Sequence, residues 1–92
     1  ESNMVKRINV TVTDPVGLYA TPATELVDRV KAFNSDIKLV YASKTVNMKS
    51  LMGVLSLGIP TKAKIEIIAD GEDEEAAIDK VTKLMKELGI SE

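Results

Sequence analysis

The stretch Ala63-Lys64-Ile65-Glu66-Ile67-Ile68-Ala69 places an apolar side chain at every second position. A β-strand turns successive side chains to opposite faces, so this pattern leaves one face apolar and the other able to meet water. We therefore expect a half-buried strand over residues 63–69. Strands of this kind are typical of a sheet that is covered on one face only.

A turn and a long helix are predicted after this strand. Asp70-Gly71 is typical of a turn, and Asp73 suits the N-cap of the helix that follows. Gly89 fits the C-terminal end of that helix. The apolar positions expected to face the core are Ala77, Val81, Leu84, Met85 and Leu88.

Three more strands are predicted upstream. Residues 8–12 and residues 37–41 each carry an apolar side chain at every second position. Ala42-Ser43-Lys44 is expected to form a tight turn. Thr45 and Val46 then return as a short strand, so this pair of strands is predicted to be a hairpin.

A helix is predicted between the first two of these strands. Thr21 can act as its N-cap, and Pro22 suits a first helical turn. Asn34-Ser35-Asp36 is expected to end it. The expected buried positions are Ala23, Leu26, Val27, Val30 and Phe33, while Glu25, Asp28, Arg29 and Lys31 are expected to face water.

A short third helix is predicted within residues 47–57, where the side chains are apolar nearly all round. Ser50 is a good N-cap for it, and Gly58 and Pro60 are expected to end it. A helix of about two turns cannot bury every side, so an exposed apolar patch is expected there.

The element order β-α-β-β-α-β-α predicts one α+β domain over residues 1–92, with residues 1–4 as a loose N-terminal end. We expect an open-faced β-sandwich, in which three helices cover one face of a four-stranded antiparallel sheet. Apolar residues make up 45% of the chain and aromatic residues only 3%, so the core must be aliphatic.

The composition excludes several classes of function. The chain has no cysteine and no histidine, which removes thiolate chemistry, the usual catalytic triads and most zinc sites. The net charge of −2 offers no basic excess for direct binding of nucleic acid. No carboxylate pair stands out as a general acid and base, and the glycines form no phosphate loop. No cofactor and no metal are expected.

The chain contains no long apolar stretch that could insert into a bilayer and no signal-like apolar segment near its start. We therefore expect a cytoplasmic protein.

Two segments remain as candidate sites. Gly17-Leu18-Tyr19-Ala20-Thr21-Pro22-Ala23 leads a loop into a helix N-terminus, where unpaired N–H groups favour anions, although a plain capped helix start has the same pattern.

In Asn47-Met48-Lys49-Ser50-Leu51-Met52-Gly53, a phosphoryl group on Ser50 would gain from the helix N-terminus and lie next to the Lys49 cation. Leu51, Met52 and Leu55 would form an apolar patch beside it. The alternative is a buried connector helix with an ordinary N-cap serine.

Together these two segments resemble the family of the histidine-containing phosphocarrier protein, HPr. The first resembles its Gly-[Ile/Leu]-His-Ala-Arg-Pro-Ala loop, and the second resembles the segment around its regulatory serine. The resemblance continues through Val54–Gly58 and Ala69–Ala76, and it covers about Val5 to Leu88 with the same element order.

The resemblance implies a role in the phosphoenolpyruvate:sugar phosphotransferase system. In that family, enzyme I phosphorylates the loop histidine, the loop arginine helps to hold the phosphoryl group, and the phosphate passes on to sugar permease domains. In Gram-positive members an HPr kinase/phosphorylase modifies the serine, and the seryl-phosphorylated form binds the catabolite control protein.

This chain departs from the family at both active-loop positions. Tyr19 stands where the histidine belongs and Thr21 where the arginine belongs, so no catalytic residue is expected. Ser50 is kept as the expected phosphorylation site. The residues expected to bind partners are Lys49, Leu51, Met52, Leu55 and Tyr19. This combination is similar in logic to the catabolite-repression HPr-like protein, Crh, which has glutamine at the histidine position but keeps the arginine.

The leading hypothesis is therefore a non-catalytic regulatory module that is phosphorylated on Ser50 by an HPr kinase/phosphorylase-like enzyme. It would act in carbon catabolite regulation by binding the catabolite control protein or other phosphotransferase-system proteins. One alternative is a phosphocarrier after all, either as a loop variant of a parent with histidine at position 19 or with Tyr19 as a dead-end acceptor. Another is an unmodified decoy or scaffold that competes with HPr for enzyme I or a sugar permease domain.

Overall fold

The computed structural model describes residues 5–92, and the loose end expected for residues 1–4 lies outside the described residues. Four strands form a single antiparallel sheet: β1 (Val5–Thr11), β2 (Asp36–Tyr41), β3 (Lys44–Asn47) and β4 (Lys64–Asp70). Their order across the sheet is β1-β4-β2-β3, so the stretch over residues 63–69 lies inside the sheet with a partner on each side. Ile67 of β4 is paired with Ile8 of β1 and with Leu39 of β2.

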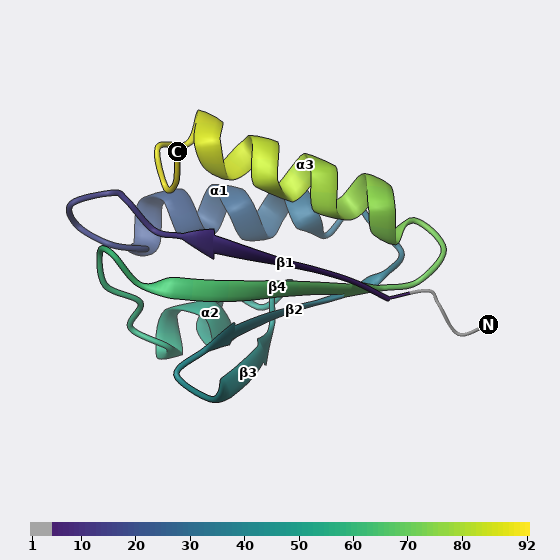
Figure 1. Cartoon of the computed structure of the whole chain (residues 1–92), viewed down its shortest axis with the longest axis horizontal. Helices are drawn as coiled ribbons and strands as arrows, with labels where there is room; N and C mark the ends of the chain where they lie inside the picture. The colour runs from purple at the N-terminus through teal and green to yellow at the C-terminus, as the bar shows by residue number, and fades with distance from the viewer. Residues whose placement is uncertain (1–4) are drawn as a thin grey trace.

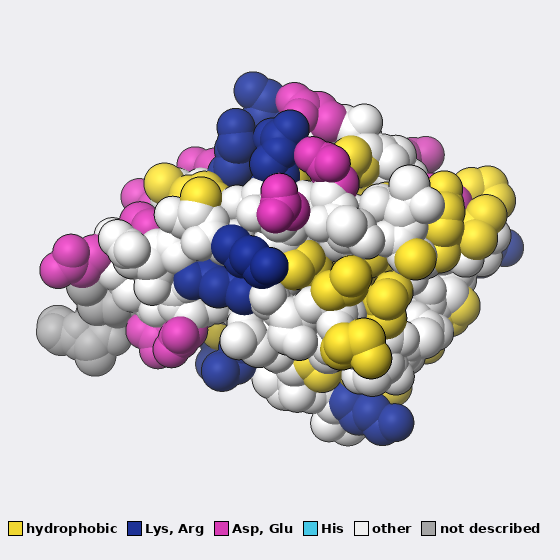
Figure 2. All heavy atoms as spheres, turned by 180° about the vertical axis from the view of Figure 1, so that it is seen from behind, with side chains coloured by type: hydrophobic (Ala, Val, Ile, Leu, Met, Phe, Trp, Pro, Cys, Tyr) yellow, Lys and Arg dark blue, Asp and Glu magenta, His cyan; other side chains and the backbone are white. Residues whose placement is uncertain are grey.

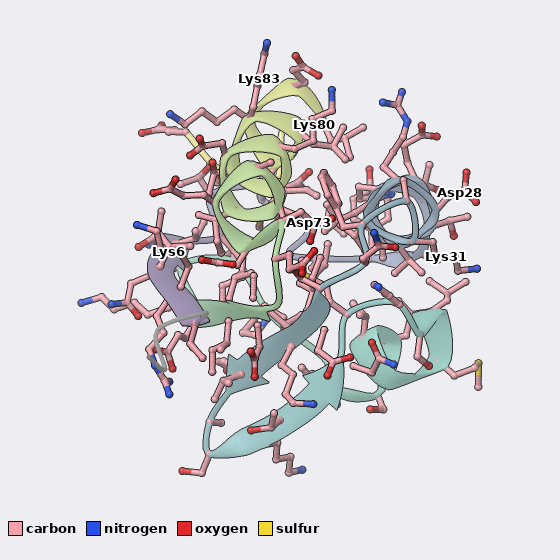
Figure 3. All side chains as sticks on the ribbon, turned by 90° about the vertical axis from the view of Figure 1, so that its right-hand side faces the viewer. Lys6, Asp28, Lys31, Asp73, Lys80 and Lys83 are labelled. Carbon is pink, nitrogen blue, oxygen red and sulfur yellow. The ribbon has the colours of Figure 1, made fainter. Side chains whose placement is uncertain are left out.

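Three helices lie on one side of this curved sheet, as Figure 3 shows: α1 (Ala20–Val30), α2 (Leu51–Ser56) and α3 (Glu74–Glu87). α1 and α3 run side by side above the sheet, and α2 lies near β3 and beside α1 (Figure 1). The predicted α+β open-faced sandwich, with its βαββαβα order, is confirmed.

The core fills the space between the sheet and the helices, and it is aliphatic as predicted. Complete burial of one such side chain contributes roughly 1.5–3 kcal/mol. Every second residue of β4 is buried, from Ile65 to Ala69, because these side chains point toward the helices. The largest fully buried side chains are Leu26, Ile37, Leu39, Met48, Ile65, Ile67, Met85, Ile90, Val12, Val30, Val54 and Val81.

The start of α1 differs from the prediction. The N-cap is Tyr19, not Thr21: its backbone is extended, and its carbonyl already accepts a hydrogen bond from the Ala23 N–H at 3.0 Å. Helical bonding therefore begins two residues before Thr21. Pro22 still lies in the first turn, where its missing N–H leaves no bond unmade.

The end of α1 also differs. The helix stops at Val30, with Lys31 as its C-cap, so Phe33 lies in the following turn and not in the helix. Its N–H donates to the Val30 carbonyl at 3.2 Å, and its side chain packs half-buried against the core. The apolar spacing continued past the helix because the turn also faces inward.

The other turns follow the prediction more closely. Ala42 and Ser43 have φ angles of 51° and 69°, as a tight hairpin turn of the type I′ family requires, whereas Lys44 belongs to β3 and not to the turn. Gly89 ends α3 with a φ of 76°. The Gly89 N–H donates to the Lys86 carbonyl at 3.1 Å and the Ile90 N–H to the Met85 carbonyl at 2.9 Å, which is the Schellman arrangement.

Asp73 occupies the N-cap position of α3, but its side chain makes no cap bond to that helix. Its carboxylate instead accepts from the Asn34 N–H and the Ser35 N–H, both at 2.9 Å, and from the Ser35 hydroxyl. Asp73 therefore joins the start of α3 to the turn after α1 (Figure 3). The Ser35 hydroxyl, followed by the Asn34 N–H, holds the pKa of the Asp73 carboxyl below its usual value.

This shift predicts how stability depends on pH. The lowered pKa favours the ionised carboxylate in the folded state, so its contribution is complete above the unfolded pKa of about 3.9 and is lost as the pH falls through the folded pKa. We expect Asp73→Asn to lower the urea midpoint at pH 7, and this deficit to shrink below about pH 3.9. Asp79→Asn, an exposed change on α3, is the control. Urea unfolding of the variants is measured in steps of roughly one pH unit from about pH 7 to about pH 2.5, and a deficit of equal size at both ends would contradict this role.

Candidate functional site

The loop between β1 and α1 is held in shape by its own hydrogen bonds. The Asp14 carbonyl accepts from the Gly17 N–H at 2.9 Å, and the Asp14 carboxylate accepts from the Val16 N–H at 2.8 Å. Leu18 is buried in the core. On either side of it, the side chains of Val16 and Tyr19 are 67% and 41% exposed. Leu18 thus fixes the loop to the core, while Val16 and Tyr19 are exposed to solvent.

Gly17 brings this loop into close contact with the segment after α2. Its φ is 85°, and a Cβ built on it would lie 2.5 Å from the Ile59 carbonyl oxygen. The neighbouring Leu18 N–H donates to that same carbonyl at 3.0 Å. Only glycine fits here without a backbone shift, because both the left-handed conformation and the close approach exclude a side chain.

Ser50 is the N-cap of α2, as predicted. Its backbone is extended, with φ −113° and ψ 113°, and its Oγ accepts a hydrogen bond from the Gly53 N–H at 3.1 Å. The Ser50 N–H donates to the Asn47 carbonyl at 3.0 Å. The residue is half-buried, and its bond to the Gly53 N–H fixes the orientation of its hydroxyl.

α2 is not a buried connector. Of its six residues only Val54 is buried, while Met52 is 78% exposed. Leu51 and Leu55 are half-buried and pack against the edge of the core. Figure 2 shows hydrophobic side chains gathered on one face, over α2 and toward the loop before α1. We call Val16, Tyr19, Leu51, Met52 and Leu55 the apolar surface.

Lys49 makes a contact that the sequence did not predict. Its Nζ donates to the Phe33 carbonyl at 2.6 Å, a half-buried bond that spans sixteen positions of the chain. The side chain therefore reaches from the start of α2 to the turn that follows α1. No local pattern signals this bond, because the two residues are brought together only by the packing of α1 against α2.

The loop at Tyr19 carries no phosphate clamp of its own. Residues 14–23 contain no lysine or arginine, and Tyr19 makes no side-chain bond that caps α1. Thr21 is exposed in the first turn of the helix. Within residues 5–92, no group of three or more acidic side chains could hold a metal ion.

A separate groove of about 430 Å³ lies away from these segments, between the edge strand β1, α3 and the C-terminal residues. In the part of the chain that the structure describes, no helix is long and apolar enough to cross a membrane.

Comparison with known proteins identifies the family. Residues 6–87 match the family described as the HPr component phosphorylation site of the phosphotransferase system. The chain belongs to the HPr family. It is thus a phosphocarrier or regulatory protein of the phosphotransferase system, in a family of non-catalytic carriers.

Three solved HPr-family structures illustrate the likeness. A histidine-containing phosphocarrier protein from Mycoplasma is 33% identical, with a TM-score of 0.92 over 95% of this chain and 99% of that one. HPr from Bacillus anthracis is 36% identical, with a TM-score of 0.83 over 89% and 98%. Bacillus subtilis Crh is 37% identical, with a TM-score of 0.71 over 85% and 88%.

The contact at Gly17 predicts a specific loss of stability in this HPr-family chain. We expect Gly17→Ala to lower the free energy of unfolding by more than about 1 kcal/mol, because the left-handed conformation alone costs an L-residue about 1–2 kcal/mol. Gly58→Ala is the matched control, since its φ is also positive, at 57°, but no atom lies within 4 Å of its built Cβ. Urea unfolding of both variants gives the comparison, and equal losses would contradict a role for the Ile59 contact.

Proposed function

We propose that this chain is a regulatory HPr-family protein that does not transfer phosphate through the loop before α1. The observation that carries the proposal is the contrast between two segments of one surface. Tyr19 and Thr21 stand at the family's histidine and arginine positions, whereas Ser50 keeps its N-cap geometry beside exposed apolar side chains.

Tyr19 is a poor substitute for the loop histidine on chemical grounds. An imidazole is largely neutral and nucleophilic near pH 7, whereas a phenol with a pKa of about 10 is protonated there. A phosphate ester of tyrosine is also a low-energy compound compared with a phosphoramidate, so onward transfer to a sugar would be uphill. The loss of arginine at position 21 further removes the planar, bidentate grip on phosphate.

Ser50 is proposed as the site where an HPr kinase/phosphorylase-like enzyme adds a phosphoryl group. Its partial exposure supports this, and so does the fixed orientation of its hydroxyl, which accepts a hydrogen bond from the Gly53 N–H. The modification would add about −1.5 to −2 charges and three strong acceptor oxygens next to Met52 and Leu55. The phosphorylated chain would then bind the catabolite control protein through phosphate and apolar surface together.

The kinase reaction tests the first half of this proposal. Incubation with HPr kinase/phosphorylase and ATP is expected to add one phosphoryl group, located on Ser50 by intact-mass and fragment spectra. Ser50→Ala should abolish the label; it also removes the N-cap, which costs about 1 kcal/mol, so its folding is checked by circular dichroism. Ser56→Ala, on the exposed side of the same helix, should label normally. Absence of phosphate on Ser50 in the wild-type chain would sink the proposal.

Transfer from phosphoenolpyruvate through enzyme I tests the second half. We expect the wild-type chain to stay unlabelled, because both the nucleophile and its phosphate clamp are missing. The double variant Tyr19→His/Thr21→Arg should accept label, and Tyr19→His alone should accept it more slowly, since the arginine contributes charge-assisted bonds to the phosphate. Rapid labelling of the wild-type chain would favour the phosphocarrier alternative.

The decoy or scaffold alternative rests on the apolar surface alone. Because Tyr19 and Met52 are exposed without any modification, a partner could dock there regardless of the state of Ser50. Equal affinity of the phosphorylated and unmodified chains for the catabolite control protein and for enzyme I would favour this alternative.

A further inference from the structure

We propose that Lys49 is a positioning residue that fastens the start of α2 to the end of α1, and that it keeps this role when Ser50 carries a phosphoryl group. The second part rests on the proposed function. It assigns to Lys49 a different task from that of a counter-ion for the phosphate, although the two residues are adjacent in the chain.

The contact itself supports the positioning role. The Lys49 ammonium donates to the Phe33 carbonyl at 2.6 Å in a half-buried position. The last carbonyls of a helix and the turn after it lack helical partners, and the negative end of the helix dipole favours a cation there. α1 ends at Val30, so the Lys49 ammonium lies in the turn that directly follows the negative end of this helix.

Lys49 completes the anchoring of the segment that carries Ser50. Met48 is fully buried, and its N–H donates to the Ile37 carbonyl at 2.8 Å. The Lys49 N–H donates to the Asn47 side chain at 2.9 Å. These bonds tie the segment to the sheet and to itself, and the Lys49 side chain adds the bond to the turn after α1.

A second tie joins the same two helices at the opposite end of α2. There the Leu18 N–H, just before α1, donates to the Ile59 carbonyl, just after α2. The Lys49 bond and the Leu18 bond therefore hold α2 against both ends of α1. The apolar surface contains residues from both sides of this pair, so its shape depends on the two ties.

Phosphorylation of Ser50 should leave the Lys49 bond in place. The Lys49 Nζ is bonded to the Phe33 carbonyl, whereas the Ser50 Oγ accepts from the Gly53 N–H at the start of α2, so the two side chains have different partners. The Lys49 bond to the Phe33 carbonyl is already formed in a half-buried position, so moving the ammonium to the phosphate would leave that carbonyl without its charged donor. The loss of this bond opposes a move of Lys49 to the phosphate.

The consequence concerns the partner. Residues 51–60 contain no charged side chain, so α2 and the segment directly after it offer no cation to the phosphate either. With Lys49 held at Phe33, the phosphate charge remains available beside the apolar surface. A partner that recognises the phosphorylated chain must then bring its own cations.

Hydrogen exchange tests the positioning role in the unmodified protein. We expect Lys49→Met to accelerate exchange roughly tenfold at the amides of Phe33 and Gly53. This factor corresponds to the loss of one charge-assisted hydrogen bond. Lys49→Arg should retain part of the protection, and Lys44→Met, which removes a charge from exposed β3, should change neither amide. Acceleration of the same size at Ile67 in β4 would indicate only global destabilisation and would overturn the proposal.

Phosphorus NMR tests whether Lys49 stays at Phe33. Phosphoserine is placed at position 50 genetically, so the result does not depend on any kinase. Pairing with Lys49 would lower the second pKa of the phosphate below its ordinary value of about 6, and Lys49→Met would then raise it. We expect Lys49→Met and Lys44→Met to have the same small effect on that pKa. A clearly larger rise in Lys49→Met would show a counter-ion and overturn the proposal, while failure of the kinase to label Ser50 would count only against the proposed function.

Discussion

The burial of one face of β4 is the constraint on which the rest of this structure depends. β4 lies between β1 and β2, and its inward side chains from Ile65 to Ala69 meet the helices above the sheet. Because the side-chain period of a strand is two, a shift of one residue would turn this aliphatic row toward water. The register of β4 therefore fixes its two neighbouring strands, and these fix the places where the loop before α1 and the segment before α2 leave the sheet.

The position of the candidate site follows from the packing of the helices on this sheet. α1 and α2 lie side by side because both cover the same sheet, and Figure 2 shows hydrophobic side chains gathered over α2 and toward the loop before α1. Gly17 permits the close approach at one end, and Lys49 bridges to Phe33 at the other. These two contacts hold the proposed docking surface in one shape, because they join α2 to both ends of α1.

Local sequence pattern predicted the element types well and their ends less well. The strands, the N-cap at Ser50 and the end of α3 at Gly89 follow from alternation and capping rules that act within a few residues. The predicted N-cap of α1 at Thr21 was wrong. Threonine followed by proline suggests a helix start, yet Tyr19 already takes the N-cap conformation. Asp73 was predicted to cap its own helix, but its carboxylate binds the turn at Asn34 and Ser35, which lie 39 and 38 positions away.

The sequence by itself determined the fold class, the aliphatic core, the absence of histidine and the place of Ser50 at a helix start, because each depends on residue type and short-range spacing. Only the tertiary structure decided which residues hold the two helices together. The bonds from Lys49 to Phe33 and from Leu18 to Ile59 join residues that are distant in the chain. Such contacts leave no periodic trace in the sequence, since they arise only when separate elements pack on one sheet and their unpaired backbone groups find partners.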